Sequence, residues 1–77
     1  MRADICDPSD KDTSQRFVAA LKSMGAVMID SHESSLGVDV RRFQIGDDVL
    51  TVFADAWSID VEGPTDVVQR IIATMRG

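Results

Sequence analysis

The sequence predicts one small α+β domain in which two helices pack on one face of an antiparallel meander sheet, in the order α-β-β-β-β-α. Two segments, one in each half of the chain, carry apolar residues at the spacing of an amphipathic helix. The region between them contains short β-branched runs separated by turn residues, which is typical of strands. Because these runs alternate apolar and polar residues, we expect one packed and one exposed face of the sheet.

Length and composition support a single folded domain over residues 1–77. A chain of 77 residues has room for one core, and a domain near this size buries only about 60–65% of the surface of its unfolded chain. The hydrophobic fraction of 44% and the charged fraction of 27% are those of a globular protein rather than a disordered chain. The N-terminal residues 1–8 are candidates for fraying, because chain ends order only when something holds them.

The charge and the single cysteine restrict the classes of partner. A net charge of −5 repels phosphate backbones, and the longest basic run is the pair Arg41 and Arg42, so no nucleic-acid partner is expected. No segment approaches the roughly 20 apolar residues of a membrane span, and no signal peptide is recognisable, so neither membrane insertion nor export is expected. Cys6 has no second cysteine to pair with, which favours a reducing, cytoplasmic setting.

The first helix is predicted for the stretch DTSQRFVAALKSMG, which begins at Asp12. Phe17, Leu21 and Met24 stand at i, i+4 and i+7 and form one apolar stripe. Asp12 is expected to cap the N-terminus, with an earlier start at the preceding Asp-Pro pair as the alternative. Gly25 stands where a left-handed C-terminal cap belongs.

Four strands are predicted to follow the first helix. They span residues 26–31, 38–45, 49–54 and 57–62, with the polar loop SHESSLG after the first strand and a turn at residues 46–48 after the second. In the second strand the apolar positions are even up to Val40 and odd from Phe43. A β-bulge at Arg41 and Arg42 would restore a single apolar face.

The last two strands are predicted to form a hairpin whose two-residue loop is Asp55 and Ala56. This register places Trp57 opposite Ala54, Ile59 opposite Val52 and Val61 opposite Leu50, so that one face is wholly apolar. Trp57 is therefore expected in the core rather than in a binding site. Asp60 and Glu62 on the other face are interpreted as solvated surface, and Asp55 as a turn former, rather than as a metal or acid/base cluster.

The second helix is predicted for the stretch PTDVVQRIIATMRG, with Pro64 just inside its start and Gly77 just past its end. Its buried stripe comprises Val67, Val68, Ile71, Ile72 and Met75. With both helices on one side of the sheet, the other face stays open.

That open face is the leading candidate for partner contact. The predicted contact residues are Arg41, Arg42, Val49, Thr51 and Phe53, which would form a modest apolar patch with a cationic edge. An outward-turned Arg41 or Arg42 would offer an anchor for a carboxylate. Two alternatives stay open. The first is that the N-terminal segment carrying Ile5, or a further element of the chain, covers this face. The second is that the two arginines only offset the charges of neighbouring acids.

The remaining titratable groups are weaker candidates for chemistry. Asp30, His32 and Glu33 lie close together in the stretch DSHES and would be the ligands of a metal or small-molecule site, with Cys6 as an additional group. One histidine and one cysteine are fewer than zinc sites require. The aspartates of DICDPSDKD lack the central glycine and final glutamate of a calcium loop, and no phosphate-binding glycine motif occurs, so neither a cofactor nor a catalytic residue is predicted.

These observations predict a small, acidic, non-enzymatic interaction or regulatory module. We expect it to contact a protein partner, or a second copy in a homodimer, through the open sheet face or an edge strand. The alternative is a small-ligand or metal-binding domain that uses Asp30, His32 and Glu33. A third hypothesis is an enzyme with Cys6 as nucleophile, which would require a thiol pKa below its usual range.

Overall fold

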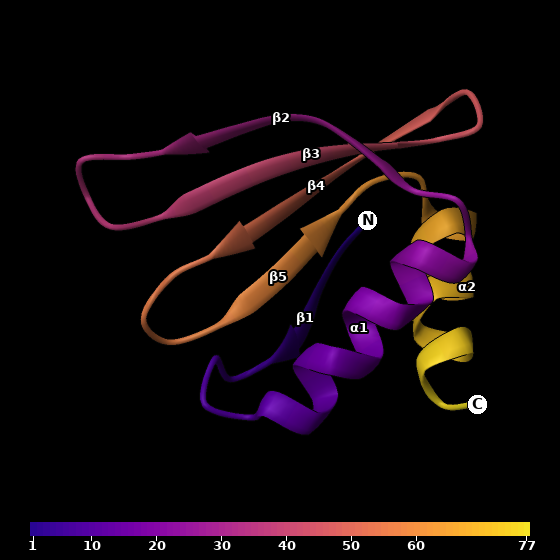
Figure 1. Ribbon diagram of the computed structural model, residues 1–77, viewed down its shortest axis with the longest axis horizontal. Coiled ribbons are helices and arrows are strands. Elements are labelled where there is room, and N and C mark those ends of the chain that lie inside the picture. Colours follow the sequence, from indigo (N-terminus) through magenta and orange to yellow (C-terminus); the bar gives the residue numbers. More distant parts are fainter.

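The computed structural model describes residues 1–77 as a five-stranded antiparallel sheet with two helices on one of its faces (Figure 1). The elements are β1 (Arg2–Cys6), α1 (Lys11–Ser23), β2 (Val27–Glu33), β3 (Asp39–Ile45), β4 (Asp48–Ala54), β5 (Ile59–Glu62) and α2 (Thr65–Met75). Strands β2 to β5 form the predicted meander, and the full strand order is β1-β5-β4-β3-β2. The predicted fold class is confirmed, with β1 as an additional strand ahead of the first helix.

Strand β1 lies within the N-terminal segment that the sequence marked as a candidate for fraying. It pairs antiparallel with β5, where Ala3 is opposite Val61. The pairing is closed at the chain end by two backbone hydrogen bonds between Met1 and Gly63, of 2.9 and 3.0 Å. Ala3 and Ile5 pack against the core, so this short strand adds apolar contacts as well as backbone pairing.

Helix α1 begins earlier than predicted. Asp10, rather than Asp12, is the N-cap: its carboxylate accepts hydrogen bonds from the backbone N–H of Thr13 at 3.1 Å and from the Thr13 hydroxyl at 2.7 Å. Asp12 lies in the first turn, where its carboxylate is 3.4 Å from Arg16. Asp10 is the cap because Thr13, three positions further on, donates both its backbone N–H and its hydroxyl group to the Asp10 carboxylate. Gly25 follows the helix with a φ of +76°, as predicted for a left-handed cap.

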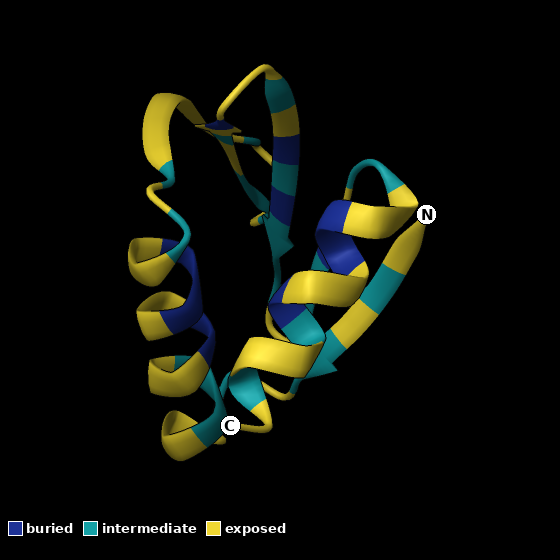
Figure 2. Ribbon diagram, turned by 90° about the vertical axis from the view of Figure 1, so that its right-hand side faces the viewer, coloured by how far each residue is buried: buried dark blue, intermediate teal, exposed yellow.

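The core lies between the two helices and the covered face of the sheet. It comprises Phe17, Ala20 and Leu21 of α1, Val67, Val68 and Ile71 of α2, and Ile45, Leu50, Val52 and Val61 of the sheet. In Figure 2 the buried part of α1 lies on the side toward α2, while its outer side is exposed. Neither helix combines the length and the apolar character that a membrane span requires.

The predicted register of the β4–β5 hairpin is wrong by two residues. Ala54 pairs with Ile59 and Val52 with Val61, so the connection comprises residues 55–58. The longer loop forms because the Asp55 carboxylate accepts the backbone N–H groups of Trp57 and Ser58, at 2.7 and 2.8 Å. A shift by two keeps each strand residue on its predicted face. Trp57, however, stands in the loop and is 83% exposed, not in the core.

The predicted bulge at Arg41 and Arg42 is also wrong. The β3–β4 register is continuous from Asp39 opposite Ala54 to Ile45 opposite Asp48, and a register shift occurs instead in β2, between Met28 and Asp30. No bulge is needed in β3 because the helices do not cover the whole face. The C-terminal part of β3 packs on the core, whereas Arg41, on the same face, keeps a side chain that is 57% exposed.

Candidate functional site

The structure places four of the five predicted contact residues on the open sheet face. Thr51 is the cross-strand partner of Arg42, and Phe53 is the partner of Val40. Since side chains alternate along a strand, Val49, Thr51 and Phe53 of β4 share this face. Arg41 is opposite the buried Val52 and therefore lies on the helix-covered side. The two adjacent arginines thus belong to different surfaces.

Arg42 is engaged by its neighbouring strand. Its Nε lies 3.1 and 2.9 Å from the two carboxylate oxygens of Asp30, and its Nη2 also contacts this carboxylate. The hydrogen bonds from Arg42, together with the positive charges of Arg42 and His32, lower the pKa of Asp30. Both partners are exposed, so the pair contributes little to stability, but it engages Nε and Nη2 of Arg42.

Arg2 covers the aromatic ring of the open face. Its guanidinium carbon lies 4.4 Å from the centroid of the Phe53 ring, and its nitrogens lie 3.0 and 3.2 Å from a carboxylate oxygen of Asp60. The N-terminal segment therefore does cover this face in part, through Arg2 rather than through Ile5, which packs against the core. Of the predicted patch, Val49 alone is an exposed large apolar residue, with 44% of its surface accessible.

A run of three exposed apolar residues lies on the opposite edge of the sheet, in β2. All seven residues of this strand are exposed, and the sheet continues no further beyond it. Val27, Met28 and Ile29 have exposed fractions of 63%, 55% and 46%. The sequence predicts a strand here, but its exposure depends on the position of the strand in the sheet, which the local pattern does not give.

The helix-covered side contains a small cavity between α1 and β3, which we call the α1/β3 cavity. Its volume is about 140 Å³. It is lined by Ser14, Phe17, Val18, Leu21, Asp39, Arg41, Phe43, Val52, Ala54 and Ile59. Arg41 stands among these mostly apolar residues, and its Nη2 is 3.9 Å from the carboxylate of Asp39. The fifth predicted contact residue therefore lines this cavity.

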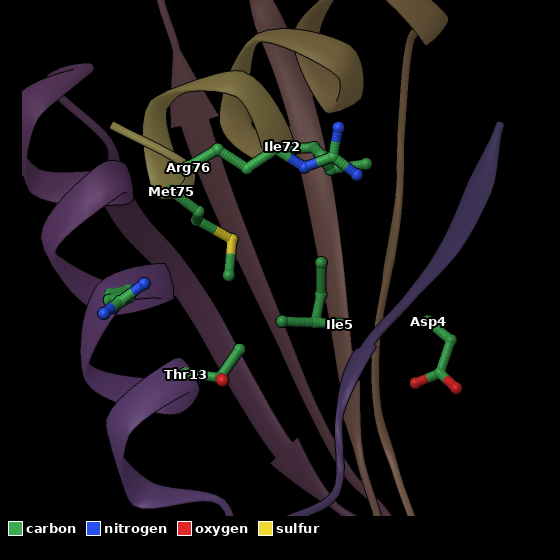
Figure 3. A pocket seen from close by; sticks show the side chains of 7 residues that line it. Asp4, Ile5, Thr13, Ile72, Met75 and Arg76 are labelled. Carbon is green, nitrogen blue, oxygen red and sulfur yellow. The ribbon is translucent and has the colours of Figure 1, made fainter.

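A second hollow, of about 260 Å³, lies where β1, α1 and the end of α2 meet (Figure 3). Ile5, Ile72 and Met75 provide its apolar lining. In Figure 3, Asp4 and Ile5 lie on opposite sides of the β1 ribbon, and the side chain of Arg76 does not point toward Asp4. The polar groups around this hollow therefore do not converge on one position.

Asp30, His32 and Glu33 belong to strand β2 rather than to a loop. Asp30 and His32 are opposite Arg42 and Val40 of the open face, whereas Glu33 is opposite Asp39 on the helix-covered side. No three side chains of histidine, cysteine, aspartate or glutamate lie close enough together to hold a metal ion. The structure thus separates the third residue of this predicted set from the first two.

The other titratable candidates have local roles. Asp55 closes the β4–β5 loop, and the two backbone hydrogen bonds that it accepts lower its pKa. Asp60 pairs with Arg2. Cys6 is a half-buried free thiol whose pKa is raised by burial and then by the negative charges of nearby aspartates. A raised pKa disfavours the thiolate that a nucleophilic cysteine requires.

Comparisons of the chain with protein-family models, with curated proteins and with solved structures gave no match. The function proposed below therefore rests on the geometry of this molecule.

Proposed function

We propose that this protein is a non-enzymatic interaction module that contacts a protein partner, or a second copy of itself, through edge strand β2. The observation that carries the proposal is that all seven residues of β2 are exposed, including its apolar segment Val27 to Ile29. An edge strand presents unpaired backbone N–H and C=O groups, and a protein partner can satisfy them by adding a strand. Adjacent exposed apolar side chains would add buried area to such a contact.

The open sheet face and edge strand β2 differ in how many of their side chains already make contacts within the protein. On the open face, Arg42 holds Asp30, and Arg2 holds Asp60 and stacks over Phe53. A partner would have to replace these internal contacts, whereas Val27, Met28 and Ile29 have no comparable cover. The free strand edge therefore supports partner contact better than the open face does.

Charge and cysteine content support the class of partner and the setting. The net charge of −5 favours association with basic proteins, because long-range attraction raises the rate of encounter. A lone free thiol is compatible with a reducing compartment. We accordingly propose a cytoplasmic regulatory role in which this module binds a basic protein or forms a homodimer.

The test compares two apolar residues of nearly equal exposure on the two surfaces. Ile29 on β2 and Val49 on the open face have exposed fractions of 46% and 44%, so Ile29→Glu and Val49→Glu each place one charge in a similar setting. Light scattering after size-exclusion chromatography measures self-association, and capture with the wild-type chain as bait measures partner binding. We expect Ile29→Glu to weaken the interaction at least tenfold and Val49→Glu to leave it within about twofold.

The opposite pattern would assign the contact to the open face, and Phe53→Asp would then abolish it as well. If both glutamate variants interact as the wild type does, or if the wild-type chain remains monomeric and retains no protein, the proposal is wrong. Circular dichroism of each variant separates loss of contact from loss of fold.

A further inference from the structure

The α1/β3 cavity exists because the helix layer ends before the sheet does. Phe17 and Leu21 of α1 reach the covered face, but the β2–β3 hairpin projects beyond both helices (Figure 1). Phe43 therefore remains half-buried at the boundary, and its cross-strand partner Met28 is exposed on β2. Phe43 thus lines the cavity and stands next to Met28, which belongs to the apolar segment of the edge strand.

The size of the cavity indicates what can enter it. Sites for small organic ligands usually have volumes of about 300–1,000 Å³, well above the 140 Å³ found here. An engineered apolar cavity of about 150 Å³ holds one benzene molecule. The α1/β3 cavity therefore has room for one large apolar side chain, which favours a segment of a protein over a free small molecule.

The guanidinium of Arg41 at this cavity indicates which chemical group should lie next to the apolar side chain of the partner. Arg2 and Arg42 each make short hydrogen bonds to a carboxylate. Arg41 makes none, and its nearest anionic neighbour, Asp39, is 3.9 Å away, beyond hydrogen-bond distance. A guanidinium carries five N–H donors in a planar fork that matches a carboxylate. The donors of Arg41 are therefore available to an anion at the cavity.

A second cation lies along the same side of α1. Ser14 and Val18 line both the α1/β3 cavity and an adjoining hollow that also contacts Lys22. The charged residues that line these two hollows are Arg41, Lys22 and one acid, Asp39, although the whole chain has a net charge of −5. This local excess of positive charge favours an acidic group beside the apolar one.

We propose that the α1/β3 cavity receives a large apolar side chain of the partner protein and that Arg41 pairs with a carboxylate next to it. The carboxylate belongs to an adjacent aspartate or glutamate, or to a chain terminus. This inference rests on the proposed function and adds the chemistry by which the partner is recognised. A partner segment seated on β2 would reach the cavity across Met28 and Phe43.

The test uses N-acetyl-L-phenylalanine and its amide as probes, because they share the benzyl group and differ in the carboxylate. Titrations are followed by the backbone amide signals in ¹⁵N–¹H NMR spectra. We expect the acid to bind with a Kd on the order of millimolar, as for a small fragment, and to shift signals of Phe43, Val52 and Ala54. The amide should bind at least threefold more weakly.

Arg41→Gln and Arg42→Gln are matched variants on opposite faces of one strand. Arg41→Gln should reduce the affinity for the acid to that for the amide, whereas Arg42→Gln should leave it unchanged. Ala54→Leu, which extends a side chain into the cavity, should abolish binding of both probes. Equal affinities of acid and amide in the wild-type chain, or equal effects of the two glutamine variants, would overturn the proposal.

Capture of the partner separates this inference from the proposed function. Ile29→Glu should leave probe binding unchanged, so a loss of probe binding in Arg41→Gln supports the cavity site even if β2 proves irrelevant to partner capture. Partner capture should fall at least threefold in Arg41→Gln. If this variant loses the probe but captures the partner normally, the cavity takes a free organic acid, and the assignment of a protein segment is wrong.

Discussion

Two aspartate side chains, Asp10 and Asp55, fix the local backbone by accepting hydrogen bonds from residues that follow them. The pattern of residues 51–62 predicts a hairpin, but its loop length depends on Asp55, which accepts two backbone N–H groups. Aspartate is favoured at the start of such turns, so the sequence is consistent with the four-residue connection as well as with the predicted two-residue loop. Asp10 caps α1 in the same way, through Thr13. Trp57 is consequently exposed, although the predicted register placed it opposite Ala54 on the core face.

At the same scale, the environment of Cys6 predicts an unreactive thiol. Burial raises its pKa first, followed by the negative charges of Asp10, Asp4 and Asp7. The rate of alkylation by iodoacetamide should therefore rise with pH at a midpoint above that of cysteine in the urea-unfolded chain. Asp4→Asn should move this midpoint downward. A midpoint in the folded protein at or below the unfolded value would contradict the prediction and revive the hypothesis of a nucleophilic cysteine.

Both helices and strands β2 to β5 could be predicted, because helical and alternating patterns are local properties of the sequence, whereas strand β1 was not predicted. What alternation could not reveal was how far α1 extends over the sheet. The change of phase in β3 indicated a bulge, yet Arg41 shares the face of the core residue Ile45 and stays exposed, because that part of the face is uncovered. The phase change thus marked the edge of the helix layer, where the α1/β3 cavity lies.

The connection from β5 to α2 depends on a close approach at Gly63. A Cβ atom at this position would lie 2.9 Å from Cδ1 of Leu50 and 3.4 Å from the carbonyl oxygen of Val49. Leu50 is almost completely buried, so its side chain cannot move aside freely. Gly63→Ala should lower the free energy of unfolding by about 1–2 kcal/mol through overpacking. Urea unfolding measures this change, and an unchanged midpoint would contradict the packing argument.

Leu50→Val provides the control for Gly63→Ala, because it removes the methyl group that the new Cβ would meet. The double variant should be destabilised by less than the sum of the two single variants, which a double-mutant cycle detects. Additive effects would show that contact with Val49 or the backbone conformation causes the loss instead.

At the scale of the whole molecule, the strand order determined which surfaces are free. Strands β1 and β5 are separated by more than 50 residues in the chain, and no local pattern indicates that they pair. That pairing brings Arg2 to Phe53 and leaves β2 as the opposite edge. Alternation could thus assign Val49, Thr51 and Phe53 to one face. The cover of Phe53 by Arg2 and the exposure of strand β2 follow only from long-range topology.

The distribution of hydrogen-bonded aspartates predicts how stability depends on pH. The carboxyl groups with lowered pKa are Asp7, Asp10, Asp30 and Asp55, and hydrogen bonds are the largest cause in each case. Since each pKa is lower in the folded than in the unfolded chain, the unfolded chain binds more protons in acid. The stability contributed by these groups is therefore fully present above the unfolded value of about 3.8. It is lost as the pH falls through each folded pKa.

Thermal unfolding between pH 7 and pH 2 tests this dependence. We expect a nearly constant Tm down to about pH 5 and a progressive fall below it, in the range where aspartates titrate. Asp55→Asn should lower the Tm at pH 7 by a few degrees and flatten the fall in acid, because the ionised acceptor of the β4–β5 loop is gone. Asp47→Asn, which changes an exposed carboxylate in the β3–β4 turn that makes no hydrogen bond or ion pair, is the control and should retain the wild-type profile. If Asp55→Asn shows the same loss of Tm on acidification as the wild type, the charge of this loop acceptor does not contribute to the acid sensitivity of the fold.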